Sequence, residues 1–198
     1  MHYTIFDTPI AKTVLRWLCW LFLKATGWRW VGKAPDCPKY IIIAAPHSTN
    51  WDFPIMLSIF CMLDDKSYWM GKHTLFRLPF KSLFRWLGGI PVERSSAHGV
   101  VEQTVEAFNR HEKLVIAIPP EGTRKKVAKW KTGFYHIACK AKVPIVLGHV
   151  DFPTKVGGYG PLFTPTGDIE TDMKDIQQFY KDKRGKYWRK ETEQSEAG

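Results

Sequence analysis

A histidine and an aspartate lie five positions apart in residues 46–52, which read PHSTNWD. Histidine suits the role of general base because the pKa of imidazole lies near neutrality. A carboxylate that accepts a hydrogen bond from one ring nitrogen fixes the tautomer and stabilises the imidazolium. His47 and Asp52 are therefore candidates for a pair that takes the proton from a hydroxyl attacking an acyl carbonyl. The alternative is that Asp52 only caps a helix beginning at Phe53.

A second polar block, EGTR, occupies residues 121–124 and is much rarer by chance than the His–Asp spacing. The Arg124 guanidinium can form paired hydrogen bonds to a phosphate. Thr123 and the backbone of Gly122 can donate to the same anion, and Glu121 can position an arginine or the hydroxyls of an acceptor. The alternative is a turn that ends a strand and carries a surface ion pair.

A third block, GGIPVER, occupies residues 88–94 and places a second arginine after a glycine pair. Arg94 and Arg124 at neighbouring strand ends could hold one phosphate between them. The alternative for Arg94 is a solvated surface charge. The histidines other than His47 show no spacing typical of metal ligands, so the sequence predicts no metal site.

Apolar runs and helical spacings alternate along the chain and predict the elements that position these blocks. The expected strands cover residues 40–45, 67–70, 90–92, 114–118 and 145–150. The expected helices cover residues 53–63, 75–87, 98–111, 134–140 and 171–181, and the glycines and prolines of residues 153–167 predict turns. This alternation predicts an α/β fold, with a mixed, partly parallel central sheet flanked by helices. In such folds sites lie at the carboxyl ends of strands, where all three polar blocks fall.

The amino-terminal residues 13–23, TVLRWLCWLFL, form an apolar run interrupted by Arg16 and followed by Lys24. The run is about half of the roughly 20 residues needed to span a bilayer. Its tryptophans beside cations are typical of an amphipathic helix that lies in the membrane interface. We therefore expect residues 1–31 to form a membrane-associating segment, without a cleaved signal peptide. The alternative is a helix packed on the core of the domain.

The chain carries 29 Lys and Arg against 19 Asp and Glu, a formal net charge of +10. This balance predicts an anionic partner: nucleic acid, an anionic bilayer or a phosphate-bearing molecule. We find no nucleic-acid-binding signature, so nucleic acid is the least favoured of these partners. The four cysteines are widely spaced, which argues against a zinc knuckle or a disulfide framework and favours a reducing compartment.

Taken in order, the blocks resemble the glycerolipid acyltransferase family of the PlsC-like, 1-acylglycerol-3-phosphate acyltransferase type. That family carries His-x4-Asp (HX4D), Gly-x-x-Phe-Ile-Asp-Arg, Glu-Gly-Thr-Arg and Val-Pro-Ile-Val-Pro blocks. The matching segments here are residues 47–52, 89–94, 121–124 and 143–146. Two departures are Pro91-Val92-Glu93 in place of Phe-Ile-Asp, and Leu147 in place of the last proline.

The resemblance implies that residues 32–198 form an acyltransferase domain that moves a fatty acyl group from acyl-CoA or acyl-carrier protein to a lysolipid hydroxyl. His47 would be the base, Asp52 would orient it, and Lys72 would stabilise the oxyanion together with backbone amides near His47. The implied phosphate-binding residues are Arg94, Glu121, Gly122, Thr123 and Arg124.

No cofactor is implied, and the resemblance favours 1-acylglycerol-3-phosphate as the acceptor, in phospholipid biosynthesis or remodelling at the cytoplasmic face of a membrane. Two alternatives stay open. One is a non-catalytic lipid-binding protein of the same fold. The other is the same chemistry on a different acceptor, such as a lyso-ornithine lipid.

Overall fold

The computed structural model describes residues 2–92, 97–125 and 127–187, and within these ranges seven strands form one sheet in the order β1-β7-β6-β2-β5-β3-β4. All neighbouring pairs are parallel except β6 and β7. The strands are β1 (Arg29–Val31), β2 (Lys39–Ala45), β3 (Ser67–Lys72), β4 (Gly89–Val92), β5 (Leu114–Ile118), β6 (Ile145–Asp151) and β7 (Val156–Phe163). The predicted mixed, partly parallel sheet is thus confirmed.

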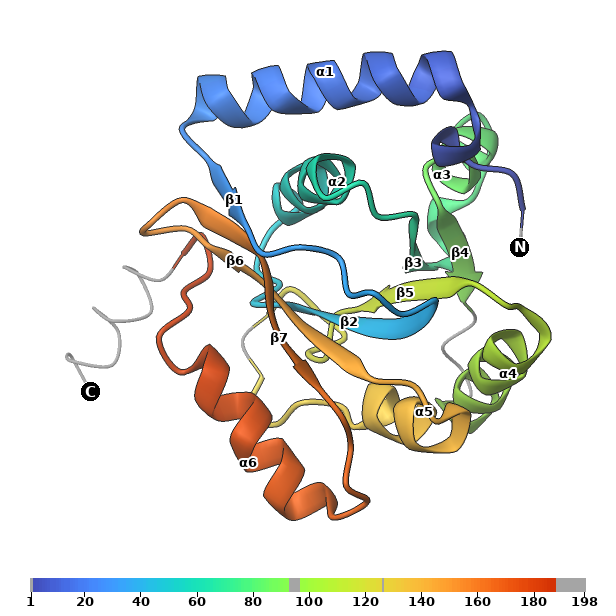
Figure 1. The fold of residues 1–198 in the computed structure, drawn as a ribbon, viewed down its shortest axis with the longest axis vertical. Coiled ribbons are helices and arrows are strands. Elements are labelled where there is room, and N and C mark those ends of the chain that lie inside the picture. Colours follow the sequence, from blue (N-terminus) through green and yellow to red (C-terminus); the bar gives the residue numbers. More distant parts are fainter. Residues whose placement is uncertain (1, 93–96, 126, 188–198) are drawn as a thin grey trace.

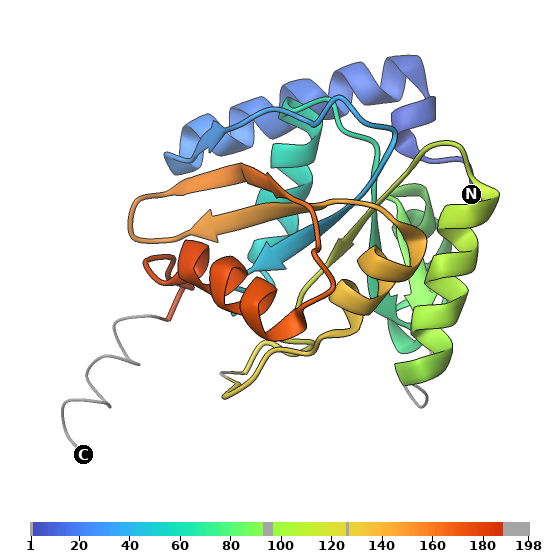
Figure 2. The same cartoon turned by 60° about the horizontal axis from the view of Figure 1, so that its bottom comes forward.

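Helices cover both faces of this sheet (Figure 1). The α-helices are α1 (Pro9–Thr26), α2 (Asp52–Met62), α3 (Lys81–Trp86), α4 (Ala97–Arg110), α5 (Gly133–Ala141) and α6 (Ile169–Tyr180), and two short 3-10 helices are η1 (Ile5–Asp7) and η2 (His73–Leu75). The helices α2 and α3 lie on one face, and α4, α5 and α6 lie on the other (Figures 1 and 2).

The central strand β2 is buried because it lies between two parallel neighbours, β5 and β6. Ile41 and Ile43 pack into the cluster that α4, α5 and α6 cover, whereas Ile42 packs into the cluster on the α2 side. Successive side chains of a strand point to opposite faces, so a continuous apolar run is what a strand covered on both sides requires.

Helix α1 forms a further layer, because it packs on α2 rather than on the sheet (Figure 1). Its buried residues Cys19 and Leu23 join Ile55 and Ile59 of α2 in one apolar cluster. The helix ends at Gly27, whose φ of 76° is the left-handed conformation that glycine adopts readily after the last turn. In the part of the chain that the structure describes, no helix combines the length and apolarity that a membrane crossing requires.

The structure corrects the predicted helix over residues 75–87, of which only α3 is α-helical. Pro79 interrupts the segment, because proline lacks a backbone N–H and disfavours helical geometry in the residue before it. The peptide bond between Leu78 and Pro79 is cis.

The predicted turns over residues 153–167 are also wrong in their central part, because β7 pairs there with both β6 and β1. Its glycines allow neighbouring atoms to approach closely rather than ending the strand. A β-carbon on Gly158 would lie 2.0 Å from the carbonyl oxygen of Val31, and one on Gly157 would lie 2.5 Å from Cδ1 of Ile59. The sequence did not indicate β1, which is only three residues long.

Candidate active site

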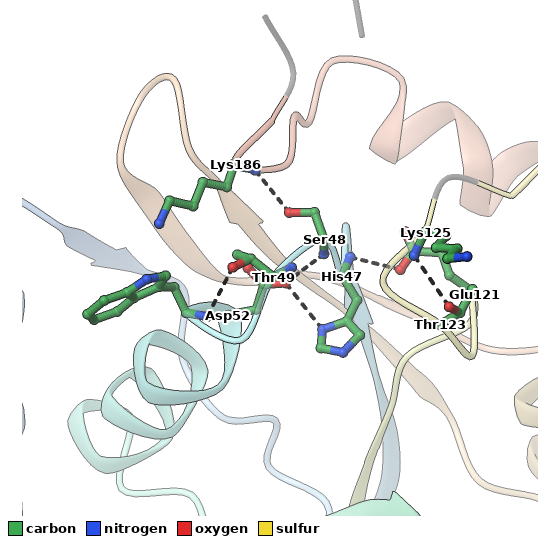
Figure 3. A network of polar contacts seen from close by, with 9 residues as sticks. His47, Ser48, Thr49, Asp52, Glu121, Thr123, Lys125 and Lys186 are labelled. Atoms are coloured by element: carbon green, nitrogen blue, oxygen red, sulfur yellow. Dashed lines mark hydrogen bonds and ion pairs between the residues drawn. The ribbon is translucent and has the colours of Figure 1, made fainter. Parts of the chain in front are cut away.

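The loop between β2 and α2 brings His47 and Asp52 together at the carboxyl end of the central strand (Figure 3). Nδ1 of His47 lies 3.2 Å from Oδ2 of Asp52. The side chain of Asp52 is 6% exposed, whereas that of His47 is 29% exposed. Since Nδ1 faces the carboxylate, Nε2 is the ring nitrogen left to meet a substrate.

The Asp52 carboxylate also organises the backbone of the loop. Its Oδ2 accepts hydrogen bonds from the amides of Ser48, at 2.6 Å, and Thr49, at 2.8 Å. The N-cap residue of α2 is Trp51, and the helix has no side-chain cap. Asp52 is therefore the first residue of α2 and binds the loop that precedes the helix, which differs from the capping alternative.

Glu121 supports the same loop from the neighbouring strand. It follows β5, which is parallel to β2, and its Oε2 accepts a hydrogen bond from the backbone N–H of His47 at 2.8 Å. The sequence pattern predicted that Glu121 contributes to substrate binding. It gave no indication of this contact, which joins residues 74 positions apart.

The rest of the Glu-Gly-Thr-Arg block forms a tight turn. The Gly122 amide donates to the carbonyl oxygen of Pro119 at 3.1 Å, so this donor is used within the turn. Oγ1 of Thr123 accepts from the amide of Lys125 at 3.3 Å, and the side chain of Arg124 is exposed.

Lys131 is a basic residue at this turn that the predicted set of site residues did not contain. A β-carbon on Gly122 would lie 3.0 Å from Cδ and Cε of Lys131, so this side chain runs along the glycine. The Lys131 amide also donates to the carbonyl oxygen of Pro120 at 2.8 Å. The Lys-x-Gly spacing of Lys131 and Gly133 was the available signal for it.

One predicted site residue, Lys72, stands farther along the same edge of the sheet. Lys72 ends β3, which is separated from β2 by β5, and its side chain is exposed. Arg94 lies outside the described residues, just after β4. Within the described ranges no hydrogen bond or ion pair joins Lys72 or Arg124 to His47, so the direct contacts involve His47, Asp52 and Glu121.

A cavity of about 560 Å³ opens beside the Glu-Gly-Thr-Arg turn. Its lining is mostly apolar and comes from the ends of β3, β4 and β5 and from α4 and α5. The lining side chains include Met70, Val101, Ile118, Trp130 and Phe134. A cavity of this size and character can accept a hydrocarbon chain.

Among the described residues, no group of three or more His, Cys, Asp and Glu side chains could hold a metal ion.

The chain that follows α6 returns to the His47 loop. The Arg184 amide donates to Oδ1 of Asp151 at the end of β6, at 2.9 Å. The Lys186 amide donates to Oγ of Ser48 at 2.9 Å (Figure 3). The Lys186 ammonium lies 5.2 Å from the centre of the Trp51 ring. Nothing in the sequence pattern indicated that this segment would contact the loop.

Comparison with known proteins places these residues in a family context. The model of the Acyltransferase family matches residues 33–146, a range that contains every predicted site residue. The 1-acyl-sn-glycerol-3-phosphate acyltransferase of Escherichia coli (strain K12) is 31% identical over 123 residues, which are 58% of this chain and 49% of that protein. The enzyme of that name from Haemophilus influenzae is 32% identical over 124 residues, which are 58% of this chain and 50% of that protein.

The chain thus spans about half the length of these curated relatives. The crystal structure of the 1-acyl-sn-glycerophosphate (LPA) acyltransferase PlsC from Thermotoga maritima matches with a TM-score of 0.57 and 16% identity, covering 90% of this chain and 85% of that one. At this identity the likeness supports the fold. The family model covers more than half of the chain and confirms the resemblance found in the sequence: the chain belongs to the Acyltransferase family.

Proposed function

We propose that this protein is an O-acyltransferase that moves an acyl group from a thioester donor to the hydroxyl of a lysolipid. The observation that carries the proposal is the contact between Nδ1 of His47 and Oδ2 of Asp52 at the carboxyl edge of the sheet. The names of the relatives favour 1-acylglycerol-3-phosphate as the acceptor, and acyl-CoA or acyl-carrier protein is the donor. The protein residues supply base catalysis without a cofactor.

In this mechanism Nε2 of His47 takes the proton of the acceptor hydroxyl, and the hydroxyl oxygen attacks the thioester carbonyl carbon. Asp52 holds the ring through Nδ1 and stabilises the imidazolium. When the tetrahedral intermediate collapses, the C–S bond breaks and the thiolate leaves with the proton that His47 carried. Base catalysis of this kind contributes about 10² to 10⁴ in rate.

The oxyanion of the intermediate needs donors from outside the His47 loop. The amides of Ser48 and Thr49 already donate to Asp52, and the amide of His47 donates to Glu121. We therefore assign stabilisation of the oxyanion to the ammonium group of Lys72, at the end of β3. The long side chain of Lys72 would move to reach the oxyanion.

We assign the acceptor phosphate to the arginines Arg94 and Arg124, with the Thr123 hydroxyl in support. Gly122 and Glu121 support them indirectly, because the Gly122 amide closes the turn on Pro119 and the Glu121 carboxylate holds the His47 loop. The exposed Arg124 side chain is available to an incoming anion, and Lys131 adds a second positive charge on the same turn. A guanidinium can bind a phosphate through two parallel hydrogen bonds.

The membrane is the place of reaction in this proposal, with residues 1–31 as the membrane-associating segment and residues 32–198 as the acyltransferase domain. Helix α1 exposes Val14, Trp17, Leu18 and Leu21 on the side away from α2, with fractional exposures of 45–61%. Such a face suits the interface of the cytoplasmic leaflet, where Trp is favoured and anionic headgroups attract cations. The two parts differ in proposed function and are not separate folding units, because α1 packs on α2 and β1 pairs with β7.

The test combines purified protein with acyl-CoA or acyl-carrier protein and a panel of lysolipids in mixed micelles. Release of free thiol and formation of acylated lipid are followed for the wild type and for His47→Ala. We expect turnover with 1-acylglycerol-3-phosphate and its loss in His47→Ala. The matched control is His111→Ala, which should retain full activity. His111 lies between α4 and β5, at the amino end of that strand, whereas His47 follows the carboxyl end of β2.

Turnover with another lysolipid alone, such as a lyso-ornithine lipid, would retain the chemistry and replace the acceptor. Absence of any acylated product, combined with equal vesicle binding by the wild type and His47→Ala, would overturn the enzyme assignment. The protein would then be a lipid-binding member of the family.

A further inference from the structure

We propose that residues 75–83, here called the 75–83 surface, form a second contact with an anionic lipid bilayer, separate from α1. The surface includes the end of η2, the loop around Pro79 and the first turn of α3. The function proposed above requires only α1 at the membrane, so this contact goes beyond it. It also does not depend on catalysis.

The first observation is a concentration of exposed apolar side chains. Leu78 is 86% exposed, Phe80 is 56% exposed, and Leu75 and Leu83 are 47% and 46% exposed. Single exposed apolar residues are ordinary on a protein surface, but four within nine residues form a patch. The Phe80 ring lies 6.1 Å from the ring of Phe84, which anchors the loop to the apolar cluster beneath it.

The second observation is the charge around this patch. Residues 66–92 contain five lysines and arginines and no aspartate or glutamate. Three of the cations, Arg77, Lys81 and Arg85, are exposed and alternate with the apolar side chains. Apolar side chains that enter the acyl region, flanked by cations at headgroup level, are the composition that favours an anionic bilayer.

The third observation is the position of α3 beside the amino-terminal end of α1 (Figure 1). The two regions are joined through His2, whose Nε2 lies 2.6 Å from the carbonyl oxygen of Arg85. The carbonyl oxygen of His2 accepts a hydrogen bond from the Tyr68 hydroxyl at 3.1 Å. The 75–83 surface therefore adjoins the helix that already exposes tryptophan and leucine, and the two can meet one lipid surface.

An acidic protein, such as a carrier protein, is the competing partner for a basic surface. The bilayer is favoured because the apolar side chains project outwards, with Leu78 almost fully exposed, instead of lining a groove. Projecting side chains gain most from a fluid apolar phase that closes around them. The proximity of the exposed face of α1 points to the same phase.

The experiment measures partition of the full chain onto phosphatidylcholine vesicles with and without phosphatidylglycerol, by flotation. One variant, Leu78→Ser with Phe80→Ser, removes the apolar contact. Another, Arg77→Gln with Lys81→Gln, removes two charges. The matched control is Leu162→Ser, because Leu162 is 49% exposed on β7 and belongs neither to α1 nor to the 75–83 surface. All substituted residues are exposed, and thermal melting checks that each variant is folded.

We expect the apolar variant to bind at least about tenfold more weakly to both kinds of vesicle. The charge variant should lose about 25-fold on anionic vesicles, or about fivefold per cation, and nothing on neutral ones. Leu162→Ser and His47→Ala should bind as the wild type does, which separates this proposal from the catalytic one. Wild-type vesicle binding by both double variants would overturn the proposal, and reduced affinity for acyl-carrier protein in the same variants would then identify a protein-docking surface.

Discussion

One oxygen of the Asp52 carboxylate contacts three groups. Oδ2 accepts from the amides of Ser48 and Thr49 and lies 3.2 Å from Nδ1 of His47. Its other oxygen, Oδ1, is buried and has no hydrogen-bond partner among the described residues. The negative charge is therefore held beside the histidine by a loop that its own hydrogen bonds shape.

Asp52→Asn should reduce kcat by about 10³-fold or more, with little change in KM. The amide nearly preserves the volume of the side chain, but it carries no charge to stabilise the imidazolium. Steady-state acyl transfer in mixed micelles measures both constants. The control is Asp64→Asn, since Asp64 forms a surface ion pair with Lys12 and should leave both constants unchanged. A kcat near the wild-type value in Asp52→Asn would show that the pair is not catalytic.

His149 is a buried histidine of β6 that the mechanism does not use. Burial, together with the nearby Lys183 ammonium, lowers its pKa from the ordinary value of 6.5 to about 4. Its Nδ1 has no hydrogen-bond partner among the described residues, and its ring lies 5.6 Å from the ring of Phe179. The folded protein therefore holds this imidazole neutral under conditions where the unfolded chain protonates it.

This shift predicts a loss of stability in mild acid. Between pH 6.5 and 4 the unfolded state binds the extra proton, so the contribution of His149 is complete above pH 6.5 and decreases as the pH falls towards 4. The full loss is about 3 kcal/mol. His149→Phe should remove this slope, as urea unfolding at a series of pH values would measure. Parallel pH dependences of the free energy of unfolding in the two proteins would contradict the prediction.

Of the residue contacts in the site, only the short-range pair could be predicted from the sequence. His47 and Asp52 lie close in sequence, and a short loop between a strand and a helix has few ways to separate them. The Glu121 contact with the His47 amide could not be predicted, because it depends on the register between β5 and β2. The same holds for Lys186 and Ser48, which are 138 positions apart.

At the scale of elements, the glycines of β7 allow β1 to pack beside it. Gly158 has a φ of 153°, and a β-carbon there would lie 2.0 Å from the carbonyl oxygen of Val31. Strand β1 is short, and among the described strands it pairs with β7 alone. The junction between the amino-terminal segment and the sheet thus depends on this residue having no side chain.

Gly158→Ala should lower the free energy of unfolding by about 3 kcal/mol or more, because the backbone must move to relieve the clash. Gly167→Ala is the control, since Gly167 also has a positive φ, 101°, but no atom lies within 4 Å of an added β-carbon. That variant should lose about 1 kcal/mol, from backbone strain alone. Equal losses in the two variants, measured by chemical unfolding, would show that close packing against β1 contributes nothing.

The same glycines explain which elements the sequence predicts correctly. Strands β2 and β5 contain continuous apolar runs and β6 begins with one, and burial on both faces is the direct cause of that pattern. In β7 the glycines predict turns although the segment is a strand. Close approach by β1 and Ile59 requires glycine there, a residue otherwise typical of turns. A rule based on composition cannot distinguish these two uses of glycine without the neighbouring chains.

At the scale of the whole molecule, the formal net charge of +10 should make lipid binding sensitive to salt. Raising salt from about 0.1 M to 1 M shortens the screening length from about 10 Å to 3 Å. Partition onto phosphatidylglycerol-containing vesicles should therefore fall by at least about tenfold. Flotation over a salt series measures this, with phosphatidylcholine vesicles as the control. A salt-independent partition would mean that apolar contacts alone carry the attachment.

The packing of α1 on α2 has a mechanical consequence. Cys19 and Leu23 fix one side of the helix on Ile55 and Ile59, so α1 cannot roll about its own axis without turning the entire body. Since α2 begins at Asp52, that rotation also tilts the His47 loop. A lipid surface that sets the roll angle of α1 consequently sets the height of the imidazole above the headgroups. The link from α1 to β1 is short, because the amides of Gly27 and Trp28 donate to the last turn of α1 and residues 29–31 pair with β7.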